Sequence, residues 1–107
     1  MAAMNMNYEQ FQKLMNDGSV VLVDYWAPWC SYCRRINPAY EKVAAQYEDS
    51  MVVAKVNIDD EPQLAHQERI EVIPTLVLYR EGKAIGSIVA PESKAMIDAF
   101  IQESLRK

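Results

Sequence analysis

The chain has 107 residues, of which 50% are hydrophobic and 24% charged, enough for one domain with its own core and no more. Its net charge of −4 argues against nucleic acid or an anionic membrane as the main partner. No apolar run approaches the roughly 20 residues of a membrane span, and residues 1–7 lack the basic and apolar parts of a signal peptide. We therefore expect a cytoplasmic protein, in a compartment where thiols stay reduced.

The chain opens with the pattern of a helix followed by a buried strand. Residues 8–17 carry apolar side chains at helical spacing. Asn7 and Gln10 can form a capping box at the start of this helix, and Gly18 can end it. The apolar, β-branched run over residues 20–26 predicts a strand that is buried on both faces of its sheet.

A second helix and a second strand follow. The period becomes helical again from residue 30 to about residue 47, and Pro38 inside this stretch is expected to kink the helix because it lacks a backbone donor. Residues 51–58 again resemble a strand. A strand, a helix and a strand over this length form a βαβ unit, so the two strands are expected to be parallel.

The second half predicts a short helix, a hairpin and a final helix. Asp60 is expected to cap the short helix, and strands over residues 75–79 and 84–89 are expected to meet in a hairpin turn at residues 80–83. The last helix, residues 93–105, has an apolar stripe made of Met96, Ile97, Phe100, Ile101 and Leu105. The whole pattern predicts a three-layer α/β/α domain around a central mixed sheet.

The two cysteines of the chain, Cys30 and Cys33, stand at the predicted junction of strand and helix. Free N–H groups and the dipole at a helix N-terminus stabilise a thiolate, the reactive form of cysteine. Cys33 lies one turn further on, on the apolar stripe, where it should be shielded. A bridge over so short a loop restrains the unfolded chain by only roughly 2 kcal/mol, so this pair suits a redox function better than a structural one.

Metal binding is the competing interpretation of the cysteine pair. Structural zinc takes four ligands, whereas this chain offers two cysteines and one histidine, His66, which lies in a polar stretch and is expected at the surface. We therefore expect no metal within one chain and no other cofactor. A cluster shared between two chains remains open as an alternative.

Asp24 interrupts the apolar run that predicts the first buried strand. Burial raises the pKa of a carboxyl group, which would equip Asp24 to transfer a proton near neutral pH. Lys55 stands in the middle of the second strand and could pair with Asp24. The alternative is a lysine whose ammonium group extends to solvent.

Taken together, these segments resemble the thioredoxin family over nearly the whole chain, in order and in spacing. The matching segments are Val23-Asp24-Tyr25-Trp26-Ala27-Pro28-Trp29-Cys30, Pro38, Lys55-Val56-Asn57-Ile58-Asp59, Ile73-Pro74-Thr75-Leu76 and Gly82. The resemblance implies the thioredoxin fold and the reduction of disulfides in substrate proteins, with recycling by a partner of the thioredoxin reductase type. A monomer is expected.

The resemblance also implies roles for single residues. Cys30 is expected to attack the substrate disulfide, Cys33 to resolve the mixed disulfide, and Asp24 to assist proton transfer. Lys55, the candidate partner of Asp24 in the sheet, is also expected to be a catalytic residue. Pro74 is expected to follow a cis peptide bond. The residues expected to contact the substrate chain are Trp29, Ser31, Tyr32, Ile73, Pro74 and Ala90.

Two positions depart from the usual family pattern. Ser31-Tyr32 stands between the cysteines in place of Gly-Pro, and a tyrosine there is similar to glutaredoxins; Ala90 replaces a glycine before the last helix. Unlike proline, Tyr32 has an N–H, which we expect to donate to the Cys30 sulfur and to raise the reduction potential. A disulfide oxidase or isomerase, a glutathione-linked or iron–sulfur module, and a structural subunit remain alternatives.

Overall fold

A computed structural model describes residues 3–107; Met1 and Ala2, part of the opening segment considered above, lie outside the described residues. The described chain contains four helices and five strands. In chain order these are β1 (Met4–Asn5), α1 (Tyr8–Asp17), β2 (Val21–Trp26), α2 (Ser31–Tyr47), β3 (Val52–Asn57), α3 (Pro62–Gln67), β4 (Thr75–Arg80), β5 (Lys83–Val89) and α4 (Lys94–Leu105).

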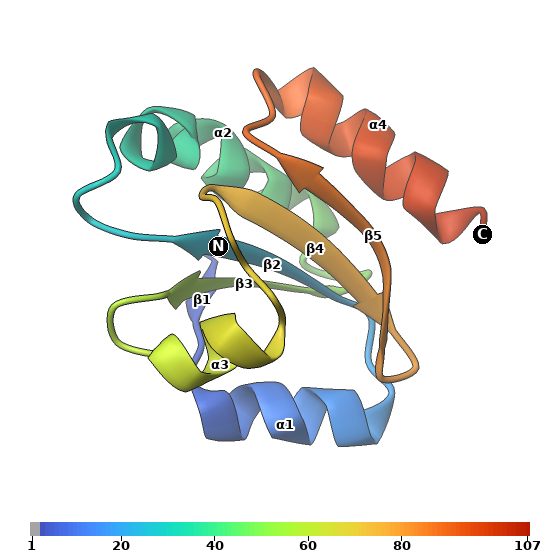
Figure 1. Cartoon of the computed structure of the whole chain (residues 1–107). Helices are drawn as coiled ribbons and strands as arrows, with labels where there is room; N and C mark the ends of the chain where they lie inside the picture. The colour runs from blue at the N-terminus through green and yellow to red at the C-terminus, as the bar shows by residue number, and fades with distance from the viewer. Residues whose placement is uncertain (1–2) are drawn as a thin grey trace.

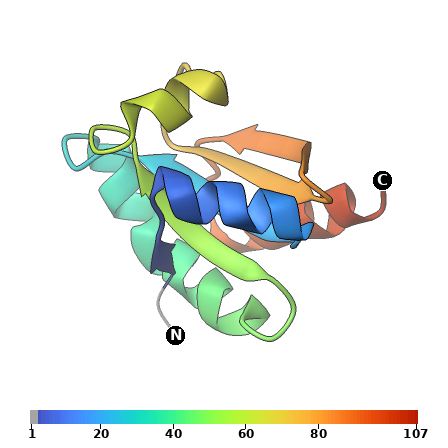
Figure 2. The same cartoon turned by 90° about the horizontal axis from the view of Figure 1, so that it is seen from below.

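The five strands form one mixed sheet in the order β1-β3-β2-β4-β5. Strands β1 and β2 run parallel to β3, whereas β4 is antiparallel to both β2 and β5. Helices α2 and α4 cover one face of the sheet, and α1 and α3 cover the other (Figure 1). The view from below shows α1 in front of the face that it shares with α3 (Figure 2). The predicted three-layer α/β/α architecture is confirmed.

Strand β2 lies at the centre of the sheet and contributes to the core on both faces. Leu22 packs with the side chains of α2 and α4, and Val21 and Val23 pack with those of α1 and α3. Its first five residues are all buried, as the apolar run predicts. Because alternate side chains of a strand point to opposite faces, Asp24 is on the same face as Leu22, beneath α2.

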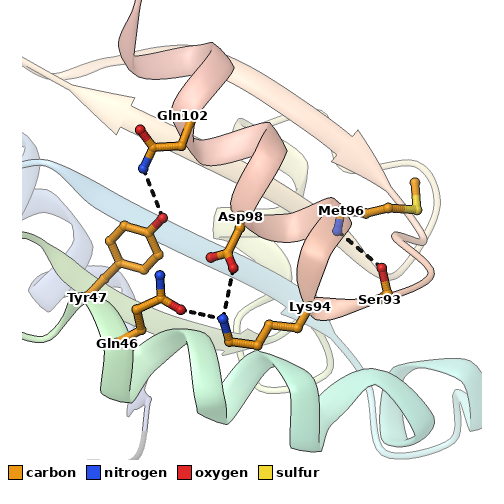
Figure 3. Close-up of polar contacts among 7 residues, drawn as sticks. All are labelled: Gln46, Tyr47, Ser93, Lys94, Met96, Asp98 and Gln102. Atoms are coloured by element: carbon orange, nitrogen blue, oxygen red, sulfur yellow. Dashed lines mark hydrogen bonds and ion pairs between the residues drawn. The ribbon is translucent and has the colours of Figure 1, made fainter.

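Polar contacts join the last turn of α2 to α4 (Figure 3). Gln102 donates to the hydroxyl of Tyr47 at 3.0 Å, and the ammonium group of Lys94 contacts both Asp98, at 2.8 Å, and Gln46. These contacts fix the C-terminal end of α2. Its first turn, which begins after Cys30, lies at the opposite end of the helix.

Local turn chemistry follows the sequence closely. Helix α1 has the expected capping box between Asn7 and Gln10, and Gly18 ends it in the left-handed conformation. Glu81 and Gly82 both have positive φ angles, 55° and 78°. Two successive positive φ angles are typical of the two-residue turn whose twist matches that of the hairpin strands. Helix α2 continues through Pro38, which cannot donate to the carbonyl of Arg34.

Two elements differ from the expectations drawn from the sequence. Strand β1 was not predicted, because two residues are too short for a period; Met4 and Asn5 pair with Ala54 and Lys55 of β3. Asp60 does not cap α3: Pro62 occupies its first turn, so Glu61 is the capping residue, without a side-chain capping bond. The Glu61 carboxylate instead accepts from the backbone N–H of Tyr8 at 2.9 Å.

The apolar stripe of α4 is narrower than predicted. Met96 is 40% exposed, whereas Ile97 and Ile101 are buried and Phe100 and Leu105 pack partly buried against the same core, as predicted. Met96 lies about 100° around the helix from Ile97, at a surface hollow that it lines with Gly86 and Ile88 of β5. None of the helices within residues 3–107 is both long and apolar enough to cross a membrane.

Candidate active site

Cys30 and Cys33 lie where β2 gives way to α2, and they form a disulfide with their Cα atoms 5.3 Å apart. Cys30 is the N-cap residue of α2. Its sulfur accepts a hydrogen bond from the backbone N–H of Cys33 at 3.2 Å. The predicted placement at a helix N-terminus is confirmed, and there a free N–H group and the helix dipole favour negative charge on sulfur.

The two cysteines differ in exposure as predicted. Cys33 is 2% exposed and belongs to the buried face of α2, whereas Cys30 is half-buried and Ser31 beside it is exposed. A molecule approaching from solvent therefore meets Cys30 first.

Tyr32 behaves differently from the expectation. Within the described residues its N–H does not reach the Cys30 sulfur; the donor is the N–H of Cys33. Tyr32 therefore does not make this contact in the disulfide form, and the raised reduction potential stays a prediction. Instead the hydroxyl of Tyr32 donates to the carbonyl of Pro91 at 2.9 Å, and the guanidinium of Arg35 lies 5.6 Å from the centre of its ring.

Asp24 is buried beneath α2, with 1% of its surface exposed. Its Oδ1 atom has no hydrogen-bond partner within residues 3–107. Burial raises the pKa of Asp24 from 3.8 to about 7; Lys55 opposes this rise and Glu41 adds to it. A carboxyl group with this pKa exchanges a proton readily near neutral pH.

A cavity of about 300 Å³ connects Asp24 with the buried cysteine. Its lining consists of Asp24, Trp26, Cys33, Arg34, Asn37 and Lys55. Asp24 and Cys33 thus line the same polar cavity, which a water molecule can enter.

Lys55 lies beside Asp24 in the sheet but does not pair with it, which corrects one of the two interpretations of this residue. The two residues are register partners on β2 and β3. The Lys55 ammonium donates to Oδ1 of Asn37 at 2.7 Å and lies 3.9 Å from a carboxylate oxygen of Glu41. Its side chain is only 13% exposed, so the solvent-extended alternative is wrong as well.

The residues expected at the substrate surface come from three separate segments around Cys30. Trp29 is 66% exposed, and its indole N–H donates to the carboxylate of Asp59 at 3.0 Å. The peptide bond between Ile73 and Pro74 is cis, as the resemblance implies. Ala90 has a positive φ of 47°, and its N–H donates to the carbonyl of Pro74 at 2.9 Å.

Asn37 and Glu41 were missed by sequence reasoning. A usable signal was present: Asn37 lies four residues after Cys33 and Glu41 four residues after Asn37, and such spacing places side chains on one face of a helix. Pro91 and Asp59, the partners of Tyr32 and Trp29, carried no signal of this kind.

A redox dithiol at the start of a helix, above a buried carboxyl group and within a mixed α/β/α sheet, defines a thiol–disulfide oxidoreductase. The family model described as "Thioredoxin" matches residues 2–103. The chain belongs to the thioredoxin family.

Curated relatives agree with this assignment. The chain is 35% identical over 92 residues to "Thioredoxin" of Porphyra purpurea, covering 86% of each chain. It is 37% identical over 94 residues to "Thioredoxin 1" of a Nostoc species, covering 88% of each chain. It is 41% identical over 92 residues to "Thioredoxin" of Acidithiobacillus ferridurans, covering 86% of this chain and 85% of that one.

Proposed function

We propose that this protein reduces disulfide bonds in other proteins, with Cys30 as the attacking thiol and Cys33 as the resolving thiol. The observation that carries the proposal is the unequal exposure of the two residues: Cys33 is 2% exposed, whereas Cys30 is half-buried and open to solvent. The helix N-terminus favours the Cys30 thiolate, which is the nucleophile in thiol–disulfide exchange.

The proposed cycle has two exchange steps. The Cys30 thiolate attacks one sulfur of the substrate disulfide; a bond forms between Cys30 and that sulfur, and the other sulfur leaves as a thiolate. Asp24 then accepts the thiol proton of Cys33, directly or through water in the shared cavity. The resulting Cys33 thiolate attacks Cys30, which releases the second substrate sulfur. The substrate gains two electrons, and the protein is left with the Cys30–Cys33 disulfide.

Substrate binding is assigned to the segments around Cys30. The exposed side chain of Trp29 offers apolar surface, and the backbone of Ile73, just before the cis Pro74, offers hydrogen bonds to an extended peptide. Ser31, Tyr32 and Ala90 complete this surface. Recycling is assigned to a partner of the thioredoxin reductase type, and the working location to the cytoplasm.

Two substitutions test the assigned roles. Cys30→Ser should abolish reduction of insulin disulfides, because the accessible nucleophile is gone. Cys33→Ser should attack but not resolve, so it should accumulate a covalent mixed disulfide visible by mass spectrometry. A Cys33→Ser protein that forms no adduct would overturn the roles. The reduction potential, measured against glutathione, separates a reductase from an oxidase or isomerase.

A further inference from the structure

The contacts of Lys55 raise a question about the site. Lys55 and Asp24 are register partners on adjacent strands, and both line the cavity beneath Cys33. Opposite charges so placed normally pair. Yet the Lys55 ammonium contacts Asn37, Glu41 and the ring of Trp26, whose centre is 4.6 Å away.

Asn37 supplies the shortest of these contacts, at 2.7 Å. It lies on α2 one turn after Cys33, and both residues line the same cavity. One turn of α2 therefore carries the resolving cysteine and an amide oxygen that binds the Lys55 ammonium group, the cation that acts on Asp24. Within residues 3–107, Oδ1 of Asp24 is left without a hydrogen-bond partner.

We propose that Asn37 is a positioning residue for proton transfer: its side-chain oxygen holds the Lys55 ammonium away from Asp24. The carboxyl group then keeps an oxygen available to the Cys33 thiol. This inference rests on the proposed function for its consequence in the cycle, but the contact itself can be tested without catalysis.

The electrostatics of the site explain why the position of Lys55 matters. An ammonium group in contact with a carboxylate lowers its pKa by about one to three units, which would make Asp24 a weaker base. The charged and titratable groups that face Asp24 are Lys55 from β3 and Cys33, Arg34, Tyr40 and Glu41 from α2. From β4 the register partner is Leu76, which carries no charge.

The positioning role of Asn37 can be tested by measuring the pKa of Asp24 in variants of Asn37. We expect Asn37→Ala to let the ammonium approach Asp24 and to lower the Asp24 pKa by about one unit or more. The readout is a carboxyl ¹³C NMR titration of the oxidised protein. Asn37→Gln keeps an amide oxygen and should return the pKa toward the wild-type value. Alanine is a strong helix former, so α2 should tolerate the change.

The same substitution in a Lys55→Met protein distinguishes a positioning role of Asn37 from a purely structural one. In a Lys55→Met protein, which has no ammonium to release, Asn37→Ala should leave the Asp24 pKa unchanged. An unshifted pKa for Asn37→Ala in the wild-type background would overturn the inference, and so would an equal shift in the Lys55→Met background.

The proposed function is tested separately through the resolving step. Its rate, followed as substrate release from the mixed disulfide across pH, should move with the Asp24 pKa in Asn37→Ala. A moved NMR titration with an unmoved rate profile would establish the Asn37 contact and refute the role of Asp24 in the cycle.

Discussion

The hydroxyl of Tyr32 donates a hydrogen bond to the carbonyl oxygen of Pro91 at 2.9 Å, between residues 59 positions apart in the sequence. The bond ties the first turn of α2, between the two cysteines, to the loop that contains Ala90. The N–H of Ala90 in turn donates to the carbonyl of Pro74 at 2.9 Å. Three segments around the dithiol are therefore linked by two hydrogen bonds.

Tyr32→Phe should loosen this link. We expect a loss of about 1 kcal/mol in the free energy of unfolding, the usual worth of one hydrogen bond, and faster hydrogen exchange at the Ala90 N–H. The KM for a protein disulfide should rise more than kcat falls, because the loop beside the substrate is less well held. Tyr8→Phe is the matched control, since it removes an exposed tyrosine hydrogen bond to Gln67 from α1. Equal exchange at Ala90 in both variants would contradict the prediction.

Asp24→Asn should stabilise the fold in a way that depends on pH. Burial raises the pKa of Asp24 from 3.8, the usual value of an aspartate side chain, to about 7 in the fold. Between these values the folded state therefore binds one proton more than the unfolded state. Stability therefore falls as pH rises from about 4 to about 7 and stays low above that range. Asparagine does not ionise, so this fall is removed.

The size of this effect follows from the pKa shift. At about 1.4 kcal/mol for each pKa unit, the Asp24→Asn protein should be more stable than the wild type by up to roughly 4 kcal/mol at about pH 8, and by little at about pH 4. Urea unfolding at several pH values measures the difference. A difference that does not change with pH would argue against a buried, protonated Asp24.

Ala90→Gly should widen access to Cys30 and relieve backbone strain. Ala90 has a φ of 47°, which costs a residue with a Cβ about 1–2 kcal/mol relative to glycine, partly offset by the greater freedom of glycine in the unfolded chain. We expect a small gain in unfolding free energy and a lower KM for bulky protein disulfides. Glu81→Gly relieves a similar φ of 55° in the hairpin and should leave the KM unchanged. A lower KM in both variants would exclude an effect of the Ala90 methyl group on the substrate surface.

Trp29→Ala should weaken substrate binding without weakening the fold. Trp29 is 66% exposed, so the unfolding free energy should change by no more than about 0.5 kcal/mol. The KM for a protein disulfide should rise about tenfold, equivalent to about 1.4 kcal/mol of lost contact. The rate with a small disulfide that does not extend past Cys30 serves as the control and should be unchanged. If both substrates slow equally, Trp29 acts on the dithiol and not on the substrate chain.

The features that the sequence determined by itself are those encoded within a short window. The position of Cys30 at a helix N-terminus follows from the change of period between residues 20–26 and the helix after it. The burial of Asp24 follows from the apolar residues around it, and the hairpin turn follows from the conformational freedom of Gly82. In each case one element, or the junction of two, contains all of the information.

Only the tertiary structure decided which partners the long polar side chains take. From the sequence Lys55 pairs with Asp24 or extends to solvent; in the fold it contacts Asn37. The acceptor for Tyr32 is the carbonyl of Pro91. The physical reason is reach: a long side chain can contact acceptors on several elements. Which acceptor it meets depends on how closely a helix packs on its sheet and on where a distant loop lies. Neither of these is determined by a short stretch of the sequence.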